Sequence, residues 1–215
     1  MPIKNNREYR DMVIEVHLNE EGEEERKIVQ GYASTFNEPY TLFEDNTLVY
    51  REQVDANAFD NTDMSDVIMQ YNHEGRVFAR ISNNTLTVTP DERGLFIEAD
   101  LSGTEIGREL YEEIKGGYTN KMSFGFVVDD DDEARTNLED GRVEYLRTIR
   151  GVSKLYDVSA VSIPCNDGTY IGVQTRSRID GAIEEVRAER LEAEELELER
   201  RKLAVRAKLL GGKTE

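Results

Sequence analysis

The chain is poor in the residues that build disulfides and zinc sites. It has one cysteine, Cys165, and two histidines, His17 and His73, among 215 residues. One cysteine excludes an internal disulfide and fits a reducing compartment. One cysteine and two histidines are also too few to form a zinc site of the usual nitrogen and sulfur type. The N-terminal residues contain no apolar signal-peptide core, so secretion is not expected. No segment approaches the roughly 18 unbroken apolar residues of a membrane span, so we expect a cytoplasmic protein with no membrane partner.

Motifs for bound cofactors are also missing. The chain has neither a glycine-rich phosphate loop nor a dinucleotide fingerprint. The acidic run Asp129 to Glu133 lacks the spaced oxygen ligands of a calcium loop, so we interpret residues 129–141 as a solvated loop. We predict that the protein uses no cofactor and no metal.

The negative charge is concentrated in the first 175 residues. The net charge is −18, and the ten basic and ten acidic residues from Arg176 onward cancel, so the preceding part carries all of it. A surface of this sign repels phosphate backbones. We therefore expect no nucleic-acid partner.

The first 175 residues contain mainly strand patterns, and we predict an α+β fold that is mostly β. Apolar residues alternate in segment 12–18, and segments 85–89 and 95–101 form the clearest hairpin. A helix is predicted for residues 102–117, with Ser102 and Glu105 as a capping box and Gly116–Gly117 at its end. A second, short helix is predicted around residues 55–59.

The composition changes sharply after residue 175, and we predict a charged helical tail for residues 176–215. Residues 178–210 contain no proline and one glycine. Leucine and valine form two series with a spacing of seven, offset by about 140° around a helix, so they do not make the single seam of a two-stranded coiled coil. Two interpretations stay open, a solvated helix and a helix that docks on a partner or forms homo-oligomers.

Ser123 is the first candidate for chemistry. It lies in the segment KMSFGF, where Met122, Phe124 and Phe126 alternate with Ser123 and Gly125. The large apolar residues anchor one face of a strand, while the other face has a hydroxyl beside a position without a side chain, where a substrate backbone could approach. The alternative is close packing in a core. The G-x-S-x-G elbow of α/β-hydrolases is absent because Lys121 takes the place of its first glycine.

A serine nucleophile needs a base, and the chain offers two histidines. His17 shares a predicted strand face with Val13 and Glu15, which indicates an outward side chain. His73 ends an apolar strand just before a loop, where a side chain can be both rigid and reachable. His73 is therefore the better candidate for a general base.

Several of these segments, in their order along the chain, resemble the prohead proteases of tailed bacteriophages. The segments are GYASTFN (31–37), NAF (57–59), NHEGR (72–76), DERGLFIEADL (91–101), GYTNKMSFGF (117–126) and LYDVSAVSIP (155–164). Members of this family are serine proteases of capsid maturation and are similar in fold to herpesvirus assemblin. The resemblance covers about residues 10–170, and it implies a closed or nearly closed, herpesvirus-protease-like β-barrel flanked by helices.

The resemblance also implies roles for three residues. Ser123 matches the nucleophile, His73 the general base, and Asp157 the carboxylate that orients the imidazole. Aspartate stands here where glutamate is commoner in the family, one methylene shorter. Related viral enzymes use a second histidine in this place, which only His17 could supply, and its predicted outward face argues against it. An oxyanion hole made of backbone N–H groups or an arginine is expected as well.

The resemblance finally implies a setting and partners. The protease domain, residues 1–175, would cut the scaffold segment and N-terminal region of the major capsid protein, and then itself, inside the immature prohead in the host cytoplasm. The tail, residues 176–215, would serve docking, oligomerisation or self-cleavage. Two other interpretations stay open: a non-enzymatic scaffold or assembly protein that retains the fold, and an unrelated β-rich binding module. The presence of both His73 and Ser123 favours the enzyme.

Overall fold

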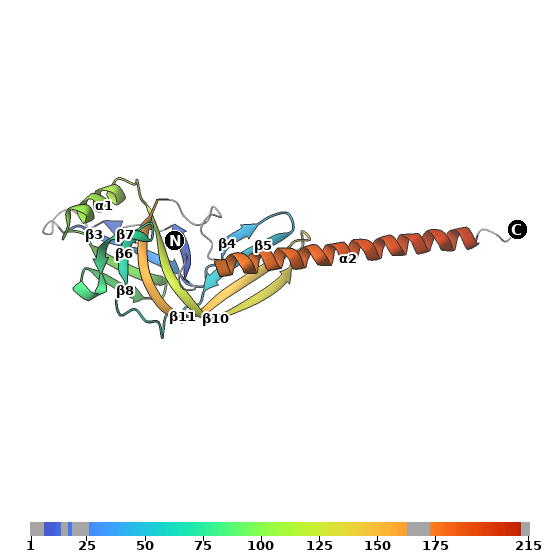
Figure 1. Cartoon of the computed structure of the whole chain (residues 1–215), viewed down its shortest axis with the longest axis horizontal. Coiled ribbons are helices and arrows are strands. Elements are labelled where there is room, and N and C mark those ends of the chain that lie inside the picture. The colour runs from blue at the N-terminus through green and yellow to red at the C-terminus, as the bar shows by residue number, and fades with distance from the viewer. Residues whose placement is uncertain (1–6, 14–16, 19–25, 163–172, 212–215) are drawn as a thin grey trace.

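The computed structural model describes residues 7–13, 17–18, 26–162 and 173–211 of the chain. These residues form mainly strands, with two α-helices and one short 3₁₀-helix (Figure 1). In chain order the elements are β1 (Glu8–Val13), β2 (His17–Leu18), β3 (Ile28–Thr35), β4 (Tyr40–Glu44), β5 (Leu48–Val54), β6 (Ile68–Tyr71), β7 (Glu74–Arg80), η1 (Ile81–Asn83), β8 (Leu86–Pro90), β9 (Gly94–Asp100), α1 (Glu105–Lys115), β10 (Lys121–Asn137), β11 (Val143–Val161) and α2 (Val173–Gly211). The predicted α+β class, mostly β with a long C-terminal helix, is confirmed.

The described strands form two sheets. The larger has seven strands, in the order β1-β10-β11-β5-β4, with β6 paired to β11 and β7 paired to β6. The smaller has four strands, in the order β2-β3-β9-β8, and its antiparallel pair β8 and β9 confirms the predicted hairpin. Among the described residues no strand pairing closes these sheets into a barrel, so the observed architecture is two packed sheets. The likeness to the herpesvirus barrel stays a prediction.

Strand β11 organises the larger sheet. One of its edges pairs antiparallel with β10 along nearly its whole length. The other edge pairs parallel with two strands in succession, first β5 through Val143–Ile149 and then β6 through Asp157–Ala160. Near its C-terminal end, β11 therefore has β10 on one side and the β6–β7 hairpin on the other.

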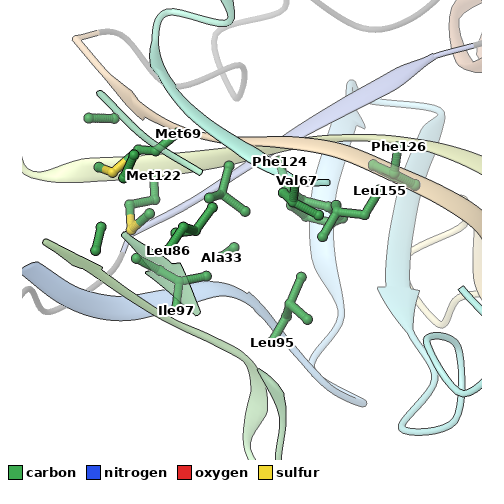
Figure 2. Packing of buried hydrophobic residues seen from close by; sticks show 14 of the residues in the cluster. Ala33, Val67, Met69, Leu86, Leu95, Ile97, Met122, Phe124, Phe126 and Leu155 are labelled. Carbon is green, nitrogen blue, oxygen red and sulfur yellow. The ribbon is translucent and has the colours of Figure 1, made fainter. Parts of the chain in front are cut away.

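The two sheets share one apolar core (Figure 2). The larger sheet contributes Met69, Met122, Phe124, Phe126 and Leu155, and the smaller sheet contributes Ala33, Leu86, Leu95 and Ile97. Full burial of one such side chain contributes about 1.5–3 kcal/mol, so the alternating apolar residues of β10 fix which face of that strand points inward. Because successive side chains of a strand point to opposite faces, Ser123 and Gly125 lie on the other face of the sheet.

The acidic run after Val128 is part of a strand. Strand β10 continues to Asn137 and pairs with β11 throughout. Its carboxylates meet arginines of the neighbouring strand, with Asp131 at 2.5 Å from Arg147 and Asp132 at 2.6 Å from Arg150. The predicted solvated loop is therefore wrong for residues 129–137, because cations on the partner strand neutralise the run.

The start of α1 and the segment around residue 55 also differ from the predictions. The N-cap of α1 is Thr104, whose hydroxyl accepts a hydrogen bond from the Gly107 N–H at 3.0 Å. The Ser102 hydroxyl instead accepts one from the Lys27 N–H at 2.7 Å, so the predicted capping box is wrong. The helix ends at Gly116 as predicted. Residues 56–61 form hydrogen-bonded turns in place of the predicted short helix.

The C-terminal helix α2 contacts the body through its N-terminal half, up to Glu189 and Arg190. Ile179, Ala182 and Val186 are buried in a second cluster, which includes Leu48, Tyr50, Val143 and Tyr145 of the larger sheet. Further along, the helix extends away from the body (Figure 1) and its larger apolar side chains are exposed: Leu191, Leu196, Leu198, Leu203 and Val205. None of the described helices is long and apolar enough to cross a membrane. The division at residue 175 and self-association through residues 178–210 stay predictions.

Candidate active site

Ser123 lies in the middle of three paired strands. Its neighbours across the ladders are Asp11 of β1 and Ser159 of β11. On the opposite face of β10, the Phe124 and Phe126 rings stack with their centroids 4.5 Å apart and hold the strand against the core. Ser123 itself is 0% exposed. Its position is therefore set by backbone pairing on both sides and by the anchoring phenylalanines.

His73 lies in the two-residue turn between β6 and β7. Asn72 and His73 both have positive φ angles, 50° and 58°. This is the pattern of a type I′ turn, which matches the right-handed twist of the flanking strands. The Asn72 side chain secures the turn, since its Oδ1 accepts hydrogen bonds from the N–H and the hydroxyl of Ser162, at 3.0 and 3.3 Å. A non-glycine residue in this region is strained, and such strain is concentrated at functional sites.

The fold brings together all three residues that the resemblance singled out. The Nε2 atom of His73 lies 2.6 Å from the Ser123 Oγ, and its Nδ1 lies 2.5 Å from Oδ1 of Asp157. Asp157 belongs to β11, where it is opposite Gly125 of β10 and is also paired with Ile68 of β6. The central strand therefore supplies the carboxylate and holds the serine strand and the histidine hairpin on its two sides.

The surroundings of these side chains are largely dry. The Asp157 side chain is 3% exposed and that of His73 is 15% exposed. Ser159 is also buried, and its hydroxyl donates a hydrogen bond to the Asp157 Oδ1 at 2.7 Å. This is the same carboxylate oxygen that faces His73. The Ser123 hydroxyl has a further acceptor, the carbonyl of Arg10 at 2.9 Å. His17, the other histidine, lies on β2, which belongs to the smaller sheet.

A buried ionic cluster joins β1 to β5 and β11, and the sequence patterns do not reveal it. Glu8 and Arg10 of β1, Glu52 of β5 and Arg147 of β11 are all at most 2% exposed. Arg10 pairs with both Glu8 and Glu52, and so does Arg147, at 2.7 and 2.8 Å. Thr175 of α2 joins the cluster by accepting from the Arg10 Nη2 and donating to the Glu8 Oε2, both at 3.0 Å.

This cluster predicts a stability that depends on acid pH. Burial raises the pKa of Glu8, but hydrogen bonds and charges from Arg147 and Arg10 outweigh it and lower the pKa from 4.5 to about 2. A lowered carboxyl pKa stabilises the fold fully above the unfolded-state value and loses that effect as the pH falls through the folded-state value. The shift corresponds to about 3 kcal/mol. We expect the free energy of unfolding to fall by roughly this amount between about pH 5 and pH 2.

Urea denaturation at a series of pH values measures this fall. A Glu8→Gln variant is the matched control, because it has no carboxyl to titrate at this position. It should be less stable at neutral pH and show a shallower decline in acid. Equal slopes for the two chains would contradict the assignment of the acid dependence to Glu8.

Among the described residues, no group of three or more histidine, cysteine, aspartate or glutamate side chains is placed to hold a metal ion. On β10, Asp131 and Asp132 meet arginine side chains, and Glu133 accepts a hydrogen bond from the Tyr50 hydroxyl. The side chains that meet at Ser123 carry a hydroxyl, an imidazole and a carboxylate group.

A serine, a histidine and an aspartate joined in one hydrogen-bonded line are the arrangement by which serine peptidases are recognised on unrelated folds. Comparison with known families gives the same class. The chain belongs to the family described as caudovirus prohead serine protease, whose sequence model matches residues 13–181. This range includes Ser123, His73 and Asp157. No curated protein and no solved structure matches the chain.

Proposed function

We propose that this chain is a prohead maturation endopeptidase that acts by Ser–His–Asp acyl transfer. The observation that carries the proposal is the position of His73, whose two ring nitrogens lie within hydrogen-bond distance of the Ser123 hydroxyl and the Asp157 carboxylate. Such reach is the first requirement for a general base acting on a nucleophile. Membership of the prohead protease family supports the same chemistry.

The proposed reaction has two halves. In the first, the Ser123 oxygen attacks the carbonyl carbon of the scissile bond while its proton moves to the His73 Nε2; the C–N bond then breaks, the leaving amine takes that proton, and an ester on Ser123 remains. In the second, a water oxygen attacks the ester, His73 takes the water proton, and the bond to Ser123 breaks as the serine recovers its hydrogen. Asp157 accepts the Nδ1–H hydrogen bond and stabilises the imidazolium in both halves.

The proposed substrates are the scaffold segment and N-terminal region of the major capsid protein, and the chain itself, inside the immature prohead of the host cell. Family membership supports a role in capsid maturation. The acidic body supports this setting, since it repels the DNA that later fills the shell. The alternative is a scaffold or assembly protein that keeps the fold without turnover, but a scaffold does not need a serine and a carboxylate on the two nitrogens of one imidazole.

Co-expression with the phage's major capsid protein tests this function and the role of Asp157 together. The native chain should convert the capsid protein to a form shortened at its N-terminus. In the Ser–His–Asp template, replacing the aspartate by asparagine holds the histidine in the wrong tautomer and lowers kcat by about 10⁴-fold. An Asp157→Asn variant should therefore leave the capsid protein at full length.

A His17→Ala variant is the control for the third position of the triad. It should process the capsid protein at the native rate, because β2 lies outside the sheet that holds Ser123. Processing lost in His17→Ala and kept in Asp157→Asn would move the third role to His17. Unprocessed capsid protein with the native chain would favour the non-enzymatic alternative.

A further inference from the structure

The Ser123 hydroxyl is enclosed, although a peptide bond must reach it. Among the described residues, two groups lie within hydrogen-bond distance of its Oγ, the His73 Nε2 at 2.6 Å and the Arg10 carbonyl oxygen at 2.9 Å. With Ser123 0% exposed, a substrate carbonyl can approach only if a neighbouring group moves. Of the two hydrogen-bond partners, the imidazole is required for the reaction. The Arg10 carbonyl, on β1, is the partner that can leave.

The hydrogen bonds show why this carbonyl also opposes the chemistry. A serine hydroxyl has one proton, so it can donate either to the Arg10 carbonyl or to the His73 Nε2. When it donates to Arg10, it does not donate to the His73 Nε2, so the hydrogen bond along which the proton would pass to the base is not made. When β1 is absent, the hydroxyl can donate to the imidazole.

The position of β1 in the sheet blocks the approach of an extended peptide. Strand β1 is the end strand of the larger sheet and pairs with β10 through six residues, Glu8 to Val13. Neighbouring strands lie about 4.8 Å apart, so a peptide added outside β1 would be roughly 10 Å from β10. A reacting carbonyl must lie about 3–3.5 Å from the nucleophile. A peptide that pairs as a strand can reach Ser123 only from the place that β1 now fills.

We propose that β1 occupies the strand position that a substrate peptide takes beside β10, so that hydrolysis requires β1 to leave. This inference rests on the proposed endopeptidase function. The ligand of the opened site is an extended polypeptide, which binds by adding a strand to the freed edge of β10. The backbone supplies most of such binding, and side-chain pockets add the sequence preference.

The buried ionic cluster connects β1, the strand that must leave, to the C-terminal helix α2. Glu8 and Arg10 hold β1 through Arg147 of β11 and Glu52 of β5, and Thr175 of α2 bonds to both residues of β1. Next to Glu8, the Arg7 guanidinium stacks over the Tyr156 ring of β11 at 3.4 Å. Movement of the first turn of α2 therefore loosens β1 and favours the open state.

A reversible disulfide between β1 and β10 tests the inference on the full chain. Val13 and Lys121 are direct partners in the ladder and lie outside the proposed catalytic groups. Directly opposite residues of antiparallel strands have Cα atoms about 4.5–5.5 Å apart, which is within the range of a disulfide. The variant carries Val13→Cys and Lys121→Cys in a Cys165→Ser background. Its substrate is a fusion of the capsid protein's N-terminal segment to a fluorescent protein, and the two single-cysteine chains are the controls.

The oxidised chain should lose at least about 100-fold in hydrolysis rate, the ratio expected if about 1% of the molecules stay uncrosslinked. Dithiothreitol should restore the native rate, and oxidation should leave the single-cysteine controls unchanged. Equal rates for oxidised and reduced double-cysteine chains would overturn the inference while the endopeptidase function stands. If the reduced chain and the native chain both fail to cut the fusion, the proposed function fails and the inference fails with it.

A Thr175→Val variant tests the same inference in the opposite direction. It removes the hydroxyl that bonds to Glu8 and Arg10 and keeps the shape of the side chain. Each of the two lost hydrogen bonds, at ordinary net strength, should raise the population of the open state, and with it the hydrolysis rate, by about two- to tenfold. A purely structural β1 predicts a rate that is unchanged or lower, and that result would count against the inference.

Discussion

Replacement of Ser123 by alanine is expected to lower kcat/KM for cleavage of the capsid-protein fusion by about 10⁴-fold or more. His73→Ala should lose a similar factor, because the hydroxyl is a weak nucleophile without a base to take its proton. The double variant should be no worse than either single variant, since residues that act as a unit have non-additive effects. Initial rates measured by chromatography of the cleaved fusion give all three values.

Ser65→Ala is the matched control for this series. Ser65 is an exposed serine whose hydroxyl donates to the Asp63 carboxylate at 2.7 Å, and its removal should leave the cleavage rate unchanged. Thermal unfolding of each variant separates lost chemistry from lost folding. A folded Ser123→Ala or His73→Ala chain that still cuts the fusion at the native rate would contradict the mechanism.

The second large effect concerns stability. Glu52→Gln should lower the free energy of unfolding by about 3–5 kcal/mol, because removal of one partner from a buried ion pair leaves an uncompensated charge. Glu52 is 0% exposed and faces both Arg10 and Arg147, so two guanidinium groups lose one of the two carboxylates that they share. Urea denaturation with a constant m-value measures the change.

Glu197→Gln is the control for this substitution. Glu197 pairs with Arg201 one turn along α2, at 2.5 Å, and both side chains are exposed. Exposed pairs of this spacing contribute about 0.3–0.5 kcal/mol, so this variant should have nearly native stability. Similar losses for Glu52→Gln and Glu197→Gln would show that burial of the cluster adds nothing to the pair energy.

Sequence patterns correctly predicted the strands whose position depends on residues close together in the chain. The alternation of Met122, Phe124 and Phe126 predicted the strand and the inward face of β10. The same pattern leaves Ser123 on the opposite face, which is where the structure places it. The hairpin of β8 and β9 was predictable for the same reason, since its apolar residues repeat with the strand period and its turn lies between them.

The features that the sequence patterns missed depend on contacts between residues that are distant in the chain. Residues 129–137 have the composition of a loop, but they form a strand that pairs with β11, whose Arg147 and Arg150 make ion pairs with Asp131 and Asp132. The ionic cluster joins positions 8, 10, 52 and 147, and no local spacing connects them. The spacing of Ser102 and Glu105 predicted a capping box at the start of α1, but the Ser102 hydroxyl accepts a hydrogen bond from the Lys27 N–H, which is distant in the chain.

In the candidate site, too, some residues could be predicted from the sequence and others could not. Ser123, His73 and Asp157 came from motifs that resemble a family, and the fold then brought them together through β11. Ser159 could have been noticed, because it lies two residues after Asp157 and therefore on the same strand face. The Arg10 carbonyl could not, since a backbone oxygen has no signature in sequence. The enclosure of Ser123 by β1 is accordingly visible only in three dimensions.

The central claim is that Ser123 is the nucleophile and His73 its base. The most direct measurement is covalent trapping with a diphenyl phosphonate attached to the peptide that precedes the capsid cleavage site, followed by mass spectrometry of the digested chain. We predict a single adduct on Ser123 in the native protein and none in the His73→Ala variant. An adduct on another residue, or equal labelling of Ser123 in both chains, would contradict the account.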